Sequence, residues 1–239
     1  MKMKKILITG ASRGIGKAIK ERLAGEYELV LHASSPDSFK YDIGKHALLC
    51  ADFSQPEQVQ HFCKQLKKEH GDLYGVINNA GLTIDNSLLF LPERDIETML
   101  QVNLKAPILI AKQAAKIFHS QQRGVIINMS SIIGQTGNAY QSIYAATKAG
   151  LVAFSKSLAQ ELGRLNEQHQ IRVNCISPGL IDSEMSAKIP QIELDKVMSN
   201  IPSNRIGKTQ EVADLVAFLV SEQASYINGA NIHINGGLY

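Results

Sequence analysis

Seven short runs of branched and aliphatic residues recur along the chain, and longer amphipathic segments separate them. Most of the runs are apolar throughout, which is typical of strands in a parallel sheet that is covered on both faces. The runs are KKILIT, YELVLH, HALLCA, LYGVIN, GVIINMS, IRVNCIS and ANIHING. Strand followed by helix, repeated along the chain, predicts an α/β fold: a doubly wound, seven-stranded parallel sheet with helices on both faces.

Helices are expected where apolar residues recur with helical spacing, at 14–24, 56–69, 92–119 (with a break near Val102), 142–165 and 209–220. Right-handed crossovers place the carboxyl ends of the strands along one edge of the sheet, where ligands bind. A chain of 239 residues with 44% hydrophobic content suits one domain over 1–239. The irregular connection 182–205 is predicted to be a substrate lid, and the alternative is a surface helix and loop.

The net charge bears on the kind of partner that the protein binds, and the cysteines bear on its cellular compartment and on metal binding. A net charge of +3 without blocks of like charge favours neither nucleic acid nor membrane, so we expect a small-molecule partner. The three widely spaced cysteines and the absence of clustered metal-ligand residues predict reduced thiols, a cytoplasmic protein and no metal. No secretory segment follows MKMKK, and no apolar run is long enough to cross a bilayer.

A glycine-rich turn follows the first predicted strand, in TGASRGIGKAI. Gly10, Gly14 and Gly16 allow a backbone to approach a pyrophosphate, and the N-terminus of the next helix favours its charge. The spacing departs from Gly-x-Gly-x-x-Gly, and a purely structural turn is the alternative. Its position between strand and helix predicts a dinucleotide site and therefore a sheet of the Rossmann type.

The end of the second strand bears on the choice of cofactor, because an acidic side chain there would repel a 2′-phosphate. His32, Ser34 and Ser35 are uncharged donors, and Arg13 could pair with a phosphate, which favours NADP(H). Asp37 is the counter-evidence, although Pro36 indicates that the strand has already ended.

Tyr144 and Lys148 lie four residues apart in SIYAATKAG, so on a helix their side chains share one face. Such a pair is common on exposed helices and predicts nothing alone. A proton donor beside an ammonium is, however, what hydride transfer to a ketone requires, because negative charge builds on the carbonyl oxygen.

Taken together, the motifs resemble the short-chain dehydrogenases/reductases, and the resemblance extends over essentially the whole chain. They occur in that family's order and approximate spacing: TGASRGIG, NNAG at 78–81, Asn103, the serine of NMSSIIG, YAATK, and SPG at 177–179. Within the family, ASRGIG, YAATKAGLVAFSKSLAQEL, RVNCISPGLIDSEM and INGANIHINGGLY most resemble the bacterial 3-oxoacyl-[acyl-carrier-protein] reductases.

The resemblance implies a catalytic set of Asn103, Ser131, Tyr144 and Lys148. Tyr144 would supply the proton, Lys148 would favour the ionised phenol and hold the nicotinamide ribose, and Ser131 would bond the substrate oxygen. Asn103 would anchor a water that links Lys148 to solvent. Ser131 is preferred because it precedes Tyr144 by thirteen residues, and the adjacent serine at position 130 is the alternative.

The resemblance also implies NADPH/NADP+ as the cofactor and a set of residues that line its cleft. Besides Tyr144 and Lys148, these are Gly10, Ser12, Arg13, Gly14, Ile15, Gly16, Ser34, Asp52, Phe53, Asn79, Ala80, Gly81, Pro178, Gly179, Ile181 and Ser183. Asp52 would reach the adenine, and Pro178, Gly179 and Ile181 would lie beside the nicotinamide. Ser183 stands where the family often has threonine and keeps the hydroxyl.

The activity implied is NADPH-dependent reduction of a 3-oxoacyl group on acyl carrier protein, in fatty-acid or related biosynthesis. The alternatives are a dehydrogenase for a small alcohol, sugar or polyketide, and a cofactor-binding regulator without turnover. Arg123, Arg164 and Arg205 are candidates for a basic patch that would bind the acidic carrier protein. The small and apolar residues of 142–165, with the resemblance, predict a homotetramer (dimer of dimers) that pairs through this helix.

Overall fold

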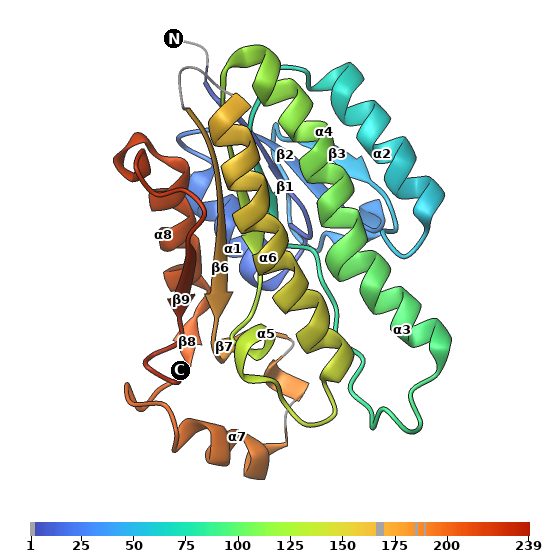
Figure 1. The fold of residues 1–239 in the computed structure, drawn as a ribbon, viewed down its shortest axis with the longest axis vertical. Coiled ribbons are helices and arrows are strands. Elements are labelled where there is room, and N and C mark those ends of the chain that lie inside the picture. Colours follow the sequence, from blue (N-terminus) through green and yellow to red (C-terminus); the bar gives the residue numbers. More distant parts are fainter. Residues whose placement is uncertain (1–2, 166–169, 185, 189) are drawn as a thin grey trace.

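A seven-stranded parallel sheet forms the centre of the molecule, which confirms the predicted fold class (Figure 1). The computed structural model describes residues 3–165, 170–184, 186–188 and 190–239. The strand order reverses between β1 and β4, and a ligand crevice is expected at their carboxyl ends. From edge to edge, the strands are β3 (Ala47–Cys50), β2 (Glu28–Ala33), β1 (Lys5–Ile8), β4 (Leu73–Asn78), β5 (Arg123–Met129), β6 (Gln170–Pro178) and β9 (Asn231–Ile234).

Helices cover both faces because successive residues of the central strands point to opposite sides and both sides are apolar. On β1, Ile6 and Ile8 belong to one core cluster and Leu7 belongs to the other. The first cluster is covered by α1 (Gly14–Leu23) and α8 (Thr209–Val220). The second is covered by α2 (Pro56–Glu69), α4 (Ala106–Gln121) and α6 (Ser142–Leu165) (Figure 1).

The break expected near Val102 is a π turn, Gln101–Lys105, between α3 (Glu93–Leu100) and α4. Pro107 explains part of it, because proline has no backbone N–H to donate to the carbonyl of Asn103, four residues earlier. π turns often occur at functional sites. This π turn contains Asn103, which the sequence singled out as a candidate catalytic residue.

Short elements gather at the carboxyl edge of the sheet, the end toward which β6 and β9 point in Figure 1. They are α5 (Ile133–Thr136), the two-stranded sheet of β7 (Ile181–Asp182) and β8 (Gly207–Lys208), and α7 (Gln191–Met198). The 3-10 turns are η1 (Pro36–Ser38), η3 (Ser186–Lys188) and η4 (Glu222–Ala224). The predicted lid, 182–205, therefore begins in β7 and contains η3 and α7, and its residues 185 and 189 lie outside the described part of the chain.

In the part of the chain that the structure describes, no helix combines the length and apolar character needed to span a bilayer.

Candidate active site

Tyr144 lies in the first turn of α6 and is half-buried at the carboxyl edge of the sheet. Burial raises the pKa of its phenol, the hydrogen bond with the Ser131 hydroxyl opposes that rise, and the Asp85 carboxylate adds to it. The phenol is therefore protonated at neutral pH, as a proton donor must be. Ser131 also accepts the backbone N–H of Ile133 at 3.2 Å, which fixes its hydroxyl where α5 begins.

Lys148 is one turn further along α6 and is only 4% exposed. Its Nζ donates to the Met129 carbonyl at 2.8 Å and lies 5.6 Å from the centroid of the Tyr144 ring. Burial lowers the pKa of Lys148 to about 8. The ammonium is thus still the main form at neutral pH, close to the phenol but not hydrogen-bonded to it.

The two adjacent serines have different surroundings. Ser130 is buried and its Oγ donates to the Lys148 carbonyl at 2.9 Å, so its hydroxyl attaches α6 to the end of β5. Ser131 is the serine that reaches the Tyr144 phenol. The bond of Ser130 to the α6 backbone and the effect of Ser131 on the Tyr144 phenol agree with the preference for Ser131, which stays a prediction.

Asn103 is fully buried in the π turn, and both polar atoms of its side chain are engaged. Oδ1 accepts the Leu82 N–H at 2.9 Å, and Nδ2 donates to the Leu82 carbonyl at 2.7 Å. A Cβ placed on Gly81 would lie 3.2 Å from Asn103 Oδ1 and 3.4 Å from Lys148 Nζ. Asn103 and Lys148 therefore converge on Gly81.

The glycines of the first turn divide into two kinds. A Cβ on Gly16 would lie 2.0 Å from the Gly10 carbonyl oxygen, so this glycine is explained by packing within the protein. Gly14 has φ +52° and a Cβ there would meet only the Ser183 Cβ, at 3.8 Å. α1 begins at Gly14 without a side-chain cap and without an acidic residue in its first turn. This open helix N-terminus fits a bound pyrophosphate.

Asn79 and Ala80 support the glycine loop from β4. Their backbone N–H groups donate to Thr9 Oγ1 at 2.9 and 3.0 Å. The Asn79 side chain donates to the Thr9 and Gly10 carbonyls, both at 3.1 Å. Thr9 was not singled out from the sequence, although its place directly before Gly10 was a usable signal.

At the end of β2, the prediction that His32 is a free donor for a 2′-phosphate is wrong. The ring is 3% exposed, and both of its nitrogens bond within the protein, to Gly10 N at 3.2 Å and to the Ala51 oxygen at 2.9 Å. Ser34 remains exposed, as does Asp37 in η1. Arg13 is also exposed, and its Nε lies 3.5 Å from a carboxylate oxygen of Glu184.

Asp52 and Phe53 follow β3 at the far side of β2. Asp52 is half-buried, and its Oδ1 accepts the Ser54 N–H at 2.9 Å. The Phe53 side chain is 5% exposed and packs in the core, so only its backbone could touch a cofactor. Tyr41, which the sequence did not indicate, donates its hydroxyl to the Ala11 carbonyl at 2.6 Å.

The remaining predicted cofactor residues lie at the other side of the crevice. Ile132 N donates to the Pro178 carbonyl at 3.1 Å, and Gly179 N donates to the Ile234 carbonyl at 3.0 Å. Ile181 is buried in β7, and Ser183 follows it beside Gly14. Ser12 and Ile15 are half-buried in the glycine turn.

The three arginines proposed for a carrier-protein patch do not converge within one chain. Arg123 begins β5, at the end opposite to Met129, and Arg164 ends α6, which places it about 24 Å along the helix from Lys148. Arg205 is held by both carboxylate oxygens of Glu211, at 2.9 and 2.6 Å.

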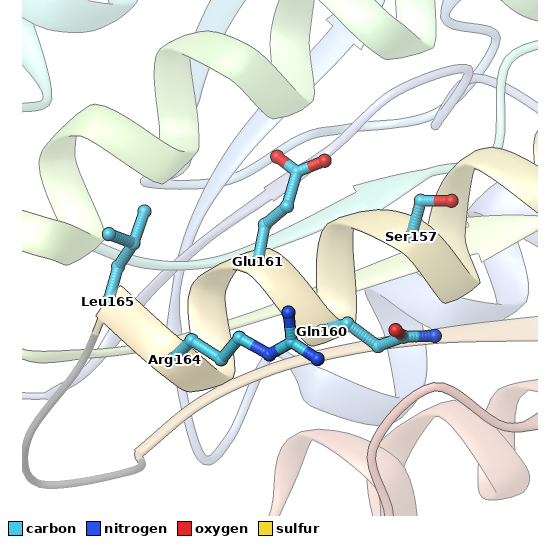
Figure 2. Close-up of a pocket in the computed structure, with 5 residues that line it drawn as sticks. All are labelled: Ser157, Gln160, Glu161, Arg164 and Leu165. Carbon is cyan, nitrogen blue, oxygen red and sulfur yellow. The ribbon is translucent and has the colours of Figure 1, made fainter.

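A shallow hollow lies on the outer face of the second half of α6 (Figure 2). Figure 2 shows that its lining side chains come from successive turns of this one helix: Ser157, Gln160, Glu161, Arg164 and Leu165. The hollow begins nine residues, about 13 Å, beyond Lys148, so it is separate from the site at the carboxyl edge. Among the described residues, no group of three or more His, Cys, Asp or Glu could hold a metal ion.

The parallel sheet is of the Rossmann type, and the Ser–Tyr–Lys group lies at the same edge of it as an open, glycine-rich helix N-terminus. This arrangement defines the class of protein as an oxidoreductase. The profile of a family described as enoyl-(acyl carrier protein) reductase matches residues 10–239. The chain belongs to the short-chain dehydrogenase/reductase family.

The curated relatives are similar over nearly their whole length. The chain is 35% identical to 3-oxoacyl-[acyl-carrier-protein] reductase FabG of Haemophilus influenzae, over 100% of this chain and 99% of that protein. It is 38% identical to nodulation protein G of a Rhizobium species, over 98% and 96% of the two chains. It is also 38% identical to (3R)-3-hydroxyacyl-CoA dehydrogenase of Mus musculus, over 98% and 95%.

Proposed function

We propose that the protein reduces a 3-oxoacyl group carried on acyl carrier protein to the 3-hydroxyacyl form, with NADPH as the reductant. The observation that carries the proposal is the convergence of the Ser131 hydroxyl, the Tyr144 phenol and the Lys148 ammonium at the carboxyl edge of the sheet. The name of the Haemophilus relative supports the substrate class.

The chemistry of the site follows from these groups. The nicotinamide supplies a hydride when it is bound. Ser131 donates a hydrogen bond to the substrate oxygen, and Tyr144 transfers its proton to that oxygen as negative charge builds there. The Lys148 ammonium, 5.6 Å from the ring, stabilises the phenolate left behind. Because burial raises the pKa of Tyr144, the phenol carries its proton at neutral pH, and the nearby ammonium lowers the cost of giving that proton up.

Reprotonation of Tyr144 requires a path to solvent. Pro107 cannot donate to the Asn103 carbonyl four residues before it, and the Asn103 side chain lies near Gly81, as does Lys148 Nζ. A water on this carbonyl would link Lys148 to solvent. In this proposal Asn103 acts through its backbone carbonyl, while its side chain holds the π turn against Leu82.

The residues proposed to hold the cofactor fit a dinucleotide phosphate. The open N-terminus of α1 takes the pyrophosphate, and Arg13 and Ser34, both exposed, take the 2′-phosphate. Asp37 is exposed on the next turn and opposes this preference. Equal catalytic efficiency with NADH and NADPH would count against the assignment of NADPH.

A second candidate is an oxidoreductase for a carbonyl that is not attached to acyl carrier protein. This second candidate is favoured because Arg123, Arg164 and Arg205 lie apart within one chain. They therefore form no basic patch beside the catalytic edge. The name of the mouse relative also points to a coenzyme A thioester. NADPH oxidation should be compared with acetoacetyl carrier protein, acetoacetyl coenzyme A, free ketones and sugars. The leading proposal expects the highest kcat/KM with the carrier protein, and a preference for any other substrate contradicts it.

The homotetramer and the substrate lid are two further proposals, based on the exposed face of α6 and on the position of segment 182–205. Ala146, Ala149 and Ala153 are exposed along one face of α6, which would let the same helix of a second copy approach closely and build the proposed homotetramer.

Segment 182–205 begins beside the glycine loop, where Ser183 approaches Gly14. We propose that it closes over the bound substrate.

A further inference from the structure

His32 lies near the end of β2, between the glycine loop and the segment that leaves β3. It is 3% exposed, so it cannot bind a ligand directly. Its backbone carbonyl accepts the Ala11 N–H at 2.8 Å, and its ring accepts the neighbouring Gly10 N–H. This one residue therefore bonds two successive N–H groups of the glycine loop.

The ring contacts define its protonation state. The backbone N–H of Gly10 can only donate, so Nδ1, at 3.2 Å, must carry a lone pair. The proton then lies on Nε2, which donates to the Ala51 carbonyl at 2.9 Å. A neutral ring satisfies both neighbours, whereas a protonated ring would place an Nδ1–H against the Gly10 N–H. Burial, which lowers the pKa of His32 to about 4, keeps the ring neutral.

Two phenylalanine rings contact the imidazole of His32. The Phe53 ring lies flat against it, with centroids 3.9 Å apart and an interplanar angle of 8°. Phe62 of α2 meets it edge-on, with centroids 5.1 Å apart and an angle of 74°. The ring therefore holds the side chain of Phe53, the residue that follows Asp52.

The segments joined by His32 lie on both sides of the proposed adenosine site. The pyrophosphate end is the glycine loop after β1, the adenine end is Asp52 after β3, and β2 lies between these strands in the sheet. A dinucleotide that binds in this way must cross the carboxyl end of β2.

We propose that His32 is a positioning residue for the adenosine half of the cofactor: its buried ring sets the separation between the glycine loop and the Ala51–Phe53 segment. The inference rests on the proposed dinucleotide-dependent function. A core histidine that only fills space would affect the stability of the fold but not binding of the adenosine half in particular.

Three variants separate the contacts of the ring. His32→Asn keeps an acceptor near Nδ1 and loses the donor to Ala51, whereas His32→Gln keeps a donor near Nε2 and loses the acceptor for Gly10. His32→Phe keeps the stacking on Phe53 and loses both hydrogen bonds. Phe62→Leu is the matched control, because it removes the edge contact in the same cluster and leaves both hydrogen bonds in place.

The test is calorimetric measurement of the Kd of NADPH and of adenosine 2′,5′-bisphosphate, together with kcat at saturating NADPH and the melting temperature. We expect His32→Phe to weaken both ligands about tenfold or more, with smaller losses for His32→Asn and His32→Gln. The kcat should stay near that of the wild type, since the nicotinamide end is untouched. Phe62→Leu should lower the melting temperature and leave both Kd values unchanged.

Unchanged Kd values in folded His32 variants would overturn the inference and leave His32 as a packing residue. A fall in kcat with unchanged binding of the bisphosphate would overturn it as well. If His32→Phe does not fold, the two milder variants decide the result by the same criteria. A wild-type protein that binds no NADPH would instead overturn the proposed function, and this inference with it.

Discussion

The buried His32 predicts how stability depends on pH. Its pKa is about 4 in the folded protein because of burial, against 6.5 for an unperturbed histidine. The unfolded chain therefore binds a proton between these values that the folded chain does not, and stability falls as pH drops from 6.5 toward 4. At pH 5 this single group should cost about 2 kcal/mol of the free energy of unfolding, and nothing above pH 7.5.

Urea denaturation of the wild type and of His32→Gln at pH 7.5 and pH 5.0, at one fixed protein concentration, isolates this contribution. The other titrating groups are present in both proteins and cancel in the comparison. The wild type should lose about 2 kcal/mol more than the variant on going to pH 5. Equal losses in the two proteins would refute the claim that the ring is held neutral by its surroundings.

Three further predictions concern the glycine turn, the lysine and the assembly. Gly16→Ala should lower the melting temperature strongly, because its Cβ would lie 2.0 Å from a carbonyl oxygen. Gly14→Ala meets no clash but is strained at φ +52°, so it should lower the melting temperature less and mainly weaken NADPH binding. The reverse pattern in melting and calorimetry contradicts this division. Since the pKa of Lys148 is about 8, kcat/KM for reduction should fall as pH rises through 8, and Lys148→Arg should move that limb to higher pH; a profile that is flat to pH 10 contradicts the role of the ammonium. Ala153→Arg should dissociate the proposed helix pair in light scattering, and a wild-type monomer at micromolar concentration would refute the tetramer.

The sequence was sufficient for the fold because the apolar runs are continuous and the helical periods between them are long. Even the break near Val102 was visible, since Pro107 interrupts the helical hydrogen bonds at Asn103. The order of the glycine turn, Ser131 and the Tyr144–Lys148 pair was also visible, and the sheet brings them to one edge.

What the sequence did not reveal depends on side-chain direction and long-range contact. His32 reads as a polar residue at a strand end, but its side chain turns inward because Gly10 and Ala51 offer it two partners. The sequence alone allows Arg123 and Arg164 to belong to a basic patch near the cleft. The fold places both at the edge of the sheet away from the catalytic groups. Neither periodicity nor motif spacing contains this information.

The central claim is that Tyr144 gives the proton that completes reduction of a carbonyl. The direct measurement is NADPH oxidation with acetoacetyl carrier protein by the wild type and by Tyr144→Phe, with calorimetry of NADPH on both. The variant should lose at least about a hundredfold in turnover while it binds NADPH with an unchanged Kd. Near-wild-type turnover in Tyr144→Phe would contradict the account.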